Sequence, residues 1–411
     1  PNLIVCPASL VLNWAEECQK FTPELSCVVV DGDAAHRAEL AESWPAADLV
    51  VTSYDLLRRD EALYEGQEFY ACILDEAQAI KNHTTQKYKA VCKVRSRVRF
   101  ALTGTPVENR LGELWSIFSF LMPGYLPPYK SFCSRFEKPI VQEEDQTAVR
   151  RLNQLTGPFI LRRMKSDVLK ELPPKTENVY RIELEEEQRK LYLAAVVDAR
   201  EKLQAAKPED KMAVFAVLMR LREICCDPRL IADNWEGGSA KLDACVELVS
   251  SAVEGGHRIL LFSQFTSMLE LLAKRLDAEG ISHFTLQGST PKPVRAELVR
   301  RFNGGEVSVF LISLRAGGTG LNLTAADIVI HYDPWWNVAA QNQATDRAYR
   351  IGQQNPVQVY KLIAQDTIEE KIVELQQAKQ SLADTVTGTA DGAILSMRPD
   401  ELLQLLEGSE P

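Results

Sequence analysis

The sequence has no apolar run long enough to cross a bilayer, which takes about 20 consecutive apolar residues. It also lacks low-complexity segments. A signal peptide is absent too, since the opening residues PNLIVCPASL are typical of a strand that enters a turn. These absences exclude the membrane-spanning and disordered classes of protein. What remains is an ordinary globular composition, 45% hydrophobic and 25% charged, in a 411-residue chain long enough for two or three domains.

None of the nine cysteines forms a C-x-x-C pair, and the five histidines are scattered. Cys6 and Cys72 lie inside apolar runs, as small core residues do. The sequence therefore indicates neither a zinc site nor a disulfide framework, which fits a reducing compartment.

The net charge of −10 argues weakly against a nucleic-acid partner, but local clusters matter more than totals. Basic residues gather at 93–99, 161–170 and 291–301. Each cluster taken alone is more simply interpreted as a solvated surface.

Short, often β-branched apolar runs alternate with helical patterns in the first and last thirds of the chain. They predict buried parallel strands, at residues 2–6, 26–30, 48–52, 70–74 and 98–102, and again at 258–263, 283–288, 307–313, 327–333 and 357–363. The middle of the chain shows few strand signals, and it predicts helices at 185–206 and 211–228, the second stopped by Asp227-Pro228. The predicted fold is α/β, with two parallel-sheet lobes and helical protrusions between them.

The sequence also lacks any G-x-x-x-x-G-K-[ST] loop, the segment that cradles phosphates in many ATPases. It nevertheless carries two adjacent carboxylates, Asp75 and Glu76, directly after a predicted strand. Such a pair can divide the work, one carboxylate holding hydrated Mg²⁺ and the other orienting or deprotonating a water. The alternative is that Asp75 merely caps a helix starting at Glu76, and the pair alone favours neither.

Two more segments follow predicted strands, where the ligands of open α/β sheets bind. Thr103 and Thr105 belong to a hydroxyl-rich turn that could sense the nucleotide state, or be an ordinary turn. The glycines at 317, 318 and 320 could let backbone N–H groups approach an anion, or form a flexible turn.

Gln343, Arg347 and Arg350 have the spacing i, i+4, i+7, which predicts one shared helix face. Two guanidinium groups on one face suit the charge of a transferring phosphoryl group, although arginines in surface salt bridges have the same pattern. The preceding Trp335 and Trp336 could stack on bases, but we favour a loop anchored in a core.

In this order, the motifs resemble those of the Swi/Snf-type helicase-like ATPases of helicase superfamily 2, which are translocases on double-stranded DNA. The likeness runs from Asn2 to about Ile372. It rests on LIVCPASLVLNWAEE (motif Ia), LDEAQAIKN (motif II), LTGTPVENRLGELWSIFSFLMPGYL (motif III), FILRRMKSDVLKELPPKTE, ILLFSQFTSML (motif IV), LQGSTPKPVRAELVRRFN, VFLISLRAGGTGLNLTAADIVIHYDPWWN (motif V) and QATDRAYRIGQ (motif VI).

The resemblance implies two RecA-like lobes with ATP between them and DNA across the top. It implies a first lobe at 1–124, incomplete at its N-terminus, a helical protrusion and exit segment at 125–178, a second protrusion at 179–236, a second lobe at 237–384, and a tail with one short helix at 385–411.

The resemblance also implies roles for single residues. Asp75 would coordinate Mg²⁺ through water, Glu76 would be the catalytic base, and Arg347 and Arg350 would be arginine fingers. The remaining assignments are ATP contacts at Gly318, Gly320 and Gln343, coupling residues Gln78, Thr103 and Thr105, and DNA-phosphate contacts at Ser9, Thr52, Ser263, Gln264, Ser289 and Arg315.

The sequence departs from the family pattern at Gln78 and Tyr349, where many members have His, and in the missing phosphate loop. Since the chain starts at Pro1, without an initiator Met, we expect an N-terminally shortened piece of a longer ATPase that is inactive alone. The short spacing between motifs III and IV predicts a bacterial or archaeal, cytoplasmic protein, which would be nuclear only if eukaryotic.

The expected function is an ATP-dependent translocase on double-stranded DNA, monomeric and away from membranes, which displaces DNA-bound proteins. Two alternatives stay open. One is a remodeler of the same fold that releases RNA polymerase, and the other is a non-catalytic DNA-binding scaffold.

Overall fold

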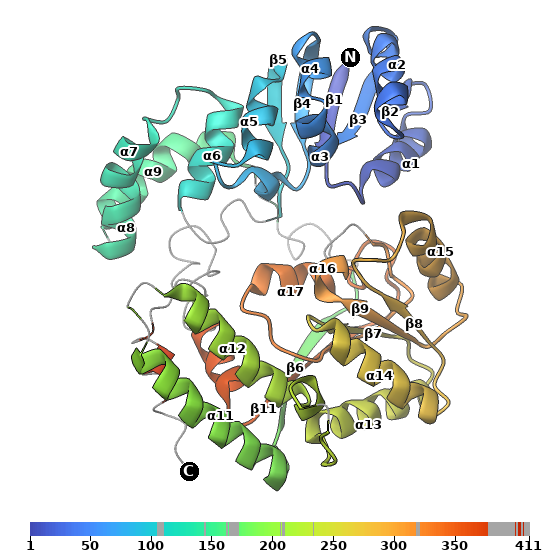
Figure 1. Cartoon of the computed structure of the whole chain (residues 1–411). Helices are drawn as coiled ribbons and strands as arrows, with labels where there is room; N and C mark the ends of the chain where they lie inside the picture. The colour runs from blue at the N-terminus through green and yellow to red at the C-terminus, as the bar shows by residue number, and fades with distance from the viewer. Residues whose placement is uncertain are drawn as a thin grey trace. The chain divides into compact units, whose positions relative to one another are not determined.

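The computed structural model describes residues 1–104, 111–143, 145–161, 163, 172–205, 207, 210–232, 234–317, 321–376, 399, 402, 403 and 406. The chain divides into two compact units, which we call unit 1 (Pro1–Arg163) and unit 2 (Met164–Leu382), apart from residues after Leu382. Each unit is an α/β body built on its own sheet, as predicted (Figure 1).

The sheet of unit 1 has five strands, all parallel, in the order β2-β3-β1-β4-β5. The bounds are Asn2–Cys6 for β1, Cys27–Val29 for β2, Leu49–Ser53 for β3, Glu68–Leu74 for β4 and Arg95–Ala101 for β5. All five strands were predicted from their apolar runs. Because the strands are parallel, the segments that follow β1, β3, β4 and β5 leave the sheet at one edge.

Helices cover both faces of this sheet. The elements are α1 (Val11–Phe21), α2 (Ala34–Ser43), η1 (Trp44–Ala46), α3 (Tyr54–Arg59), α4 (Glu61–Glu65), η2 (Ala77–Ile80) and α5 (Gln86–Lys93). The larger core surrounds Trp44, Tyr64 and Phe69, and a smaller one lies under α1. Over β4 and β5, by contrast, Tyr70 and Phe100 are more than half exposed.

A helical part of unit 1 follows β5. It contains α6 (Leu111–Leu121), α7 (Tyr129–Phe132), η3 (Cys133–Glu137), α8 (Lys138–Gln142), α9 (Gln146–Thr156) and η4 (Gly157–Phe159). These helices share a separate core, built around Phe118, Phe132 and Phe136.

The sheet of unit 2 has six parallel strands in the order β6-β11-β10-β7-β9-β8. The bounds are Lys175–Ile182 for β6, Ile259–Ser263 for β7, His283–Leu286 for β8, Val309–Ser313 for β9, Ile328–His331 for β10 and Val357–Ala364 for β11. Five of these strands were predicted. Strand β6 was not, because seven of its eight residues are exposed and its sequence KTENVYRI has no apolar run.

The helices of unit 2 include the two that the sequence predicted in the middle of the chain. Its helical elements are α11 (Glu186–Ala205), α12 (Lys211–Cys226), η5 (Pro228–Leu230), α13 (Ala240–Glu254), α14 (Thr266–Ala278), α15 (Lys292–Asn303), α16 (Leu314–Gly317) and α17 (Val338–Thr345). Helices α13 and α14 contribute to the core on one face of the sheet, and α15 contributes to the core on the other.

Helices α11 and α12 pack on each other around a third core of unit 2. This core takes in Trp336, and it also takes in Leu402 and Leu406 from the predicted tail. The Arg200 guanidinium donates a 2.8 Å hydrogen bond to the Leu406 carbonyl. The rest of the tail, apart from residues 399 and 403, lies outside the described residues.

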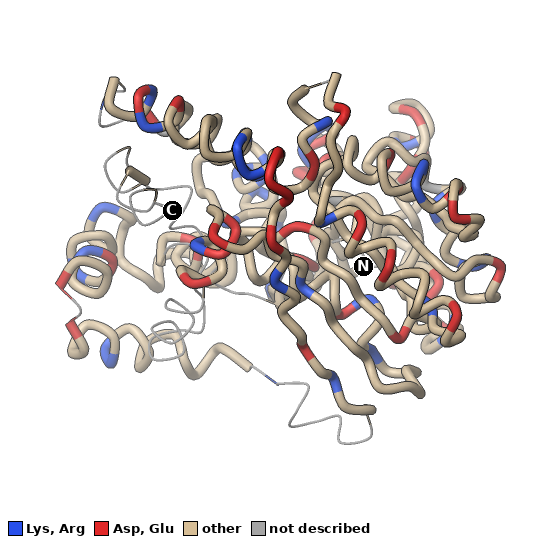
Figure 2. Tube along the Cα trace, turned by 90° about the horizontal axis from the view of Figure 1, so that it is seen from below, with Lys and Arg blue, Asp and Glu red and all other residues tan. Residues whose placement is uncertain are grey.

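Positive and negative side chains are interspersed along the traced chain (Figure 2). In the basic cluster at 93–99, Lys93 pairs with Glu61 and Arg97 with Glu68. Arg300 and Arg301 of the 291–301 cluster pair with Glu297 and Glu306. These pairs support the interpretation of both clusters as ordinary solvated surface. No helix in the described part of the chain combines the length and apolarity that a membrane crossing needs.

Candidate functional site

The carboxylate of Asp75 is held at the carboxyl end of β4 by one hydrogen bond to each oxygen. Oδ2 accepts 2.8 Å from the indole N–H of Trp14 on α1, and Oδ1 accepts 2.9 Å from the backbone N–H of Glu76. Helix η2 begins at Ala77, one residue later than a cap at Asp75 would require. The capping interpretation of Asp75 is therefore wrong, and its side chain is free to serve another purpose.

Glu76 occupies a strained backbone conformation. Its φ of 50° and ψ of 54° lie in the left-handed region, which costs a non-glycine residue roughly 1–2 kcal/mol. The turn is fixed by two flanking hydrogen bonds: the Tyr54 hydroxyl donates to the Asp75 carbonyl at 2.9 Å, and the Ala77 N–H donates to Leu102 at 2.9 Å. Strain of this kind clusters at functional sites, where the surroundings enforce it.

A chain of side-chain hydrogen bonds connects Glu76 to the end of the neighbouring strand β5. The Gln78 amide donates to Glu76 Oε2 at 2.6 Å, and the Thr103 hydroxyl donates to Gln78 Oε1 at 2.8 Å. Two of the three predicted coupling residues thus join the acidic pair to the Thr-Gly-Thr turn. The third, Thr105, lies outside the described residues.

Two of the predicted DNA-phosphate contacts have side chains that are buried and hydrogen-bonded inside their own units. Thr52 is fully buried, and its hydroxyl accepts a 2.8 Å bond from Tyr64. Ser263 is 1% exposed, and its hydroxyl donates 2.6 Å to Asp333. These interior partners argue against the side-chain contacts to DNA phosphate that the resemblance implied at both positions.

The other four predicted contacts differ in position. Ser9 is half-buried in the turn between β1 and α1, and Ser289 is exposed between β8 and α15. Gln264 donates its backbone N–H to Asp333 and its amide to the sulfur of Met219. Arg315 has its backbone in α16, and its side chain is not described.

The predicted shared helix face of Gln343, Arg347 and Arg350 is wrong. Helix α17 ends at Thr345, so only Gln343 is helical. Beyond the helix, Leu323 donates its N–H to the Arg347 carbonyl at 3.0 Å, a long-range bond that helical periodicity cannot reveal. Gln353 fixes the same turn by donating to three carbonyls, those of Thr324, Ala326 and Ala348.

The two arginines nevertheless converge on one place. Arg347 is 5% exposed and donates from Nε to the Gly317 carbonyl at 3.1 Å, while Arg350 donates from Nη1 to Leu321 at 3.2 Å. They therefore hold the backbone on both sides of residues 318–320. Gly318 and Gly320 themselves lie outside the described residues. Gly317 has no room for a side chain, since a Cβ would stand 2.6 Å from the Phe262 ring.

The donor set at Asp75 suits Mg²⁺ better than a metal held mainly by protein. Mg²⁺ keeps several waters and binds through one or two carboxylates. No group of three or more His, Cys, Asp or Glu able to hold a metal occurs among the described residues. Residues that sequence reasoning missed are Trp14, Tyr54 and Gln353. A tryptophan in an amphipathic helix predicts core packing, and its N–H gave no separate signal.

Comparisons with known proteins point to one family. Residues 1–230 match the model of the SNF2-related domain, and residues 240–352 match the helicase conserved C-terminal domain. The chain is 40% identical over 412 residues to an uncharacterized ATP-dependent helicase of Mycoplasma pneumoniae, covering 99% of this chain and 39% of that protein. It is 39% identical over 415 residues to a putative ATP-dependent helicase/translocase of Bacillus subtilis, covering 98% and 45%. The chain spans about two fifths of the length of these curated relatives.

Two solved structures are similar over nearly the whole chain. One is the SWI2/SNF2 ATPase core of Sulfolobus solfataricus in complex with double-stranded DNA, with a TM-score of 0.50, 34% identity and coverage of 99% of this chain and 86% of that one. The other is the same core described as a domain alone, with a TM-score of 0.50, 35% identity and coverage of 99% and 84%.

Proposed function

Because the chain belongs to the SNF2-related family, we propose that the protein is an ATP-dependent translocase on double-stranded DNA that remodels or displaces DNA-bound proteins. The observation that carries the proposal is the bonded chain from Glu76 through Gln78 to Thr103, beside a carboxylate oriented on both oxygens. Support for the DNA substrate comes from the similar Sulfolobus core in complex with double-stranded DNA.

In this proposal Asp75 holds Mg²⁺ through water, and bound Mg²⁺ supplies positive charge to the ATP phosphates. Trp14 and the Glu76 N–H fix the direction of the Asp75 carboxylate. Glu76 takes a proton from the attacking water, and Gln78 holds the Glu76 carboxylate in place for that step. Thr103 connects this position to the segment after β5, and we assign Thr105 a coupling role beside it.

We assign to Arg347 and Arg350 the positive charge that stabilises the transferring phosphoryl group. The proposed contacts to the nucleotide are Gln343, Gly318 and Gly320. In the structure both guanidinium groups hold backbone carbonyls beside the glycine-rich segment. Ser9, Gln264, Ser289 and Arg315 remain proposed contacts to the DNA backbone.

The 411-residue chain alone is proposed to be inactive in hydrolysis, since none of its segments has the phosphate-loop pattern. In P-loop enzymes the backbone amides of that loop and its lysine cradle the β- and γ-phosphates. The test compares DNA-stimulated ATPase activity of this chain with that of a longer form that carries such a loop. Robust hydrolysis by the 411 residues alone would place the phosphate site elsewhere.

The assignment of Glu76 is tested by Glu76→Gln in the hydrolysing form. An amide cannot take a proton, so ATP binding should persist while hydrolysis falls by about 10²-fold or more. Glu68→Gln is the matched control, since Glu68 is an exposed carboxylate at the start of β4, the strand that precedes Glu76, and pairs at the surface with Arg97. Turnover of the Glu76 variant within a few-fold of wild type would remove Glu76 from the proposed mechanism.

A further inference from the structure

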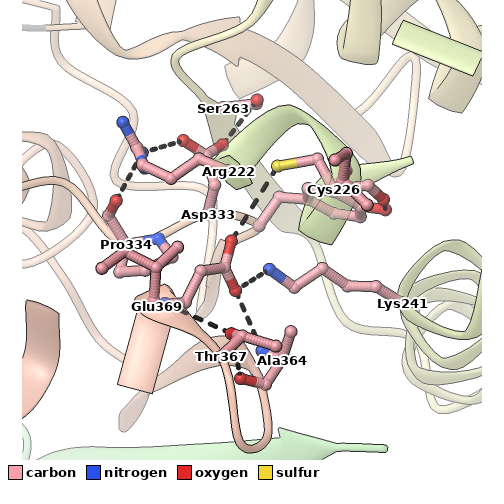
Figure 3. Close-up of polar contacts among 12 residues, drawn as sticks. Arg222, Cys226, Lys241, Ser263, Asp333, Pro334, Ala364, Thr367 and Glu369 are labelled. Atoms are coloured by element: carbon pink, nitrogen blue, oxygen red, sulfur yellow. Dashed lines mark hydrogen bonds and ion pairs between the residues drawn. The ribbon is translucent and has the colours of Figure 1, made fainter. Parts of the chain in front are cut away.

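A buried polar network joins four elements of unit 2 (Figure 3). At its centre Arg222 of α12 pairs with Asp333, which follows β10, at 3.1 Å, and both side chains are fully buried. The same Arg222 nitrogen, Nη2, donates 2.6 Å to the Pro334 carbonyl. On its other side Asp333 accepts from Ser263 at 2.6 Å and from the Gln264 N–H at 3.2 Å.

Aromatic rings enclose the Arg222 guanidinium. Its central carbon lies 4.8 Å from the ring centre of Trp336, 5.5 Å from Phe265 and 5.7 Å from Trp335. Trp335 and Trp336 stack on each other at 4.5 Å, which confirms their expected role as a loop anchor in a core. Among the described residues Nε and Nη1 of Arg222 have no hydrogen-bond partner, so the hydrogen bonds of this side chain there all come from Nη2.

Every contact of that nitrogen is to residues that lead directly into α17. Asn337 follows Trp336, and its side chain caps α17 by accepting 2.6 Å from the Ala340 N–H. Helix α17 carries Gln343, and Arg347 follows two residues after the helix ends. The far end of α17 is fixed to β10, since His331 Nε2 lies 2.8 Å from the Thr345 hydroxyl.

We propose that Arg222 is a positioning residue that transmits the position of the α11–α12 pair to the segment 333–350. A bound ligand or a mechanical force that shifts α12 would thereby move Asp333 and the start of α17, and with them Arg347 and Arg350. The position of the α11–α12 pair would then set the positions of these two arginines. The effect of this coupling on ATP hydrolysis rests on the proposed function, whereas the coupling between α12 and α17 itself does not.

The network supplies its own control. Lys241 of α13 and Glu369 form a second fully buried ion pair at 2.5 Å, which is drawn in the same view (Figure 3). Glu369 lies in the segment after β11 and also accepts from the Ala364 N–H at 2.9 Å. Replacing the Lys241–Glu369 pair removes an equally buried ion pair but leaves the Asp333 carboxylate and the Pro334 carbonyl in place.

The experiment replaces each pair by apolar residues in the 411-residue chain, Arg222→Met with Asp333→Leu and, separately, Lys241→Met with Glu369→Leu. Such exchanges are often neutral or stabilising, because both desolvation costs disappear together. Amide hydrogen exchange across α17 and residues 346–350 is then measured alongside the melting temperature. The Arg222–Asp333 double variant should exchange about tenfold faster or more in this segment, while the Lys241–Glu369 variant should not.

Arg222→Lys provides a second measurement in which the buried positive charge is kept. A single ammonium replaces the guanidinium fork, so we expect a smaller rise in exchange, confined to residues 333–345. The proposal is overturned if exchange in α17 is unchanged in the Arg222–Asp333 variant, or if both double variants raise it equally. Because no nucleotide is used, these outcomes are independent of the Glu76→Gln test.

Discussion

Gln78 donates a hydrogen bond of 2.6 Å to the carboxylate of Glu76. Its amide orientation is fixed from the other side, since its oxygen must accept the 2.8 Å bond from Thr103. One side chain thus has to be a donor toward Glu76 and an acceptor toward Thr103. A neutral imidazole also offers one of each, on its two ring nitrogens.

We therefore predict that Gln78→His preserves hydrolysis in a form of the protein that turns over ATP, while Gln78→Ala lowers it by roughly 10-fold to 10²-fold. Gln78→Glu should be at least as harmful as Gln78→Ala, since a second carboxylate would face Glu76. The measurement is kcat with and without double-stranded DNA. If Gln78→Ala responded to DNA like the wild type, the bonded chain would have no part in coupling.

Trp14 allows a sharper test of the metal carboxylate. Trp14→Phe keeps an aromatic ring in α1 but removes the N–H that orients Asp75 Oδ2. Because groups that orient metal ligands typically contribute 10-fold to 100-fold in metal affinity, the Mg²⁺ concentration for half-maximal hydrolysis should rise by about tenfold. Trp44→Phe is the control: Trp44 is a fully buried ring of unit 1 whose Nε1 has no hydrogen-bond partner among the described residues. An unchanged Mg²⁺ requirement in Trp14→Phe would contradict the orienting role.

The strands of both sheets were largely predictable because burial on two faces leaves continuous apolar runs such as ILLFS and VFLIS. Strand β6 was not predicted because it lies at the sheet edge and its side chains are exposed to solvent. No local pattern distinguishes such a strand from a loop. It is specified by its eight-residue register with β11, which is information of long range.

At the site, sequence patterns identified the residues but not their neighbours. Asp75, Glu76, Gln78 and Thr103 lie together as their positions after parallel strands implied. The helix expected to carry Arg347 ends at Thr345, and the Arg347 carbonyl accepts a tertiary hydrogen bond from Leu323. Thr52 and Ser263 have the same strand-end pattern as surface groups, and only the packing of Tyr64 and Asp333 shows that they are interior.

The two arginines should respond differently to truncation. Arg350 is half-buried, so Arg350→Ala should lower hydrolysis by about 10³-fold with little effect on ATP binding, as expected for transition-state charge. Arg347 is nearly buried, so Arg347→Ala should in addition destabilise unit 2 by about 1–3 kcal/mol, by leaving the Gly317 carbonyl without this donor. Turnover, ATP affinity and denaturant unfolding separate the two effects. Equal losses of binding and rate in Arg350→Ala would make it a ground-state contact instead.

His331 predicts how unit 2 responds to acid. Burial, and then the charge of nearby Lys361, lower the pKa of His331 from 6.5 to about 3. The ring is 2% exposed and stacks on Phe262, and its Nε2 lies 2.8 Å from the Thr345 hydroxyl. The Thr345 hydroxyl also lies 3.3 Å from the Gln341 carbonyl, to which it can donate. Because burial disfavours the imidazolium, the folded state holds His331 in its neutral form.

The sign of the pH effect follows from the direction of that shift. Between pH 6.5 and about 3 the unfolded chain binds a proton at His331 that the folded chain does not, so stability is lost as the pH falls. At 1.36 kcal/mol per pH unit, the loss from this group is roughly 3 kcal/mol between pH 6.5 and pH 4. Above pH 6.5 both states are neutral at this position and the contribution is constant.

His331→Gln isolates this term, because its amide can donate to the Thr345 hydroxyl or accept from it but does not titrate. Burial raises the pKa of Glu177, but hydrogen bonds from Lys175 and Lys361 lower it by more, so that the pKa is about 2. Glu177 therefore adds acid sensitivity to the wild type and to the variant. Urea unfolding of unit 2 at several pH values from 7 to 4 should therefore give a shallower loss of stability in the variant, even if its stability at pH 7 is lower. Parallel curves would mean that His331 is protonated in the folded state as readily as in the unfolded chain, which would contradict the lowered pKa.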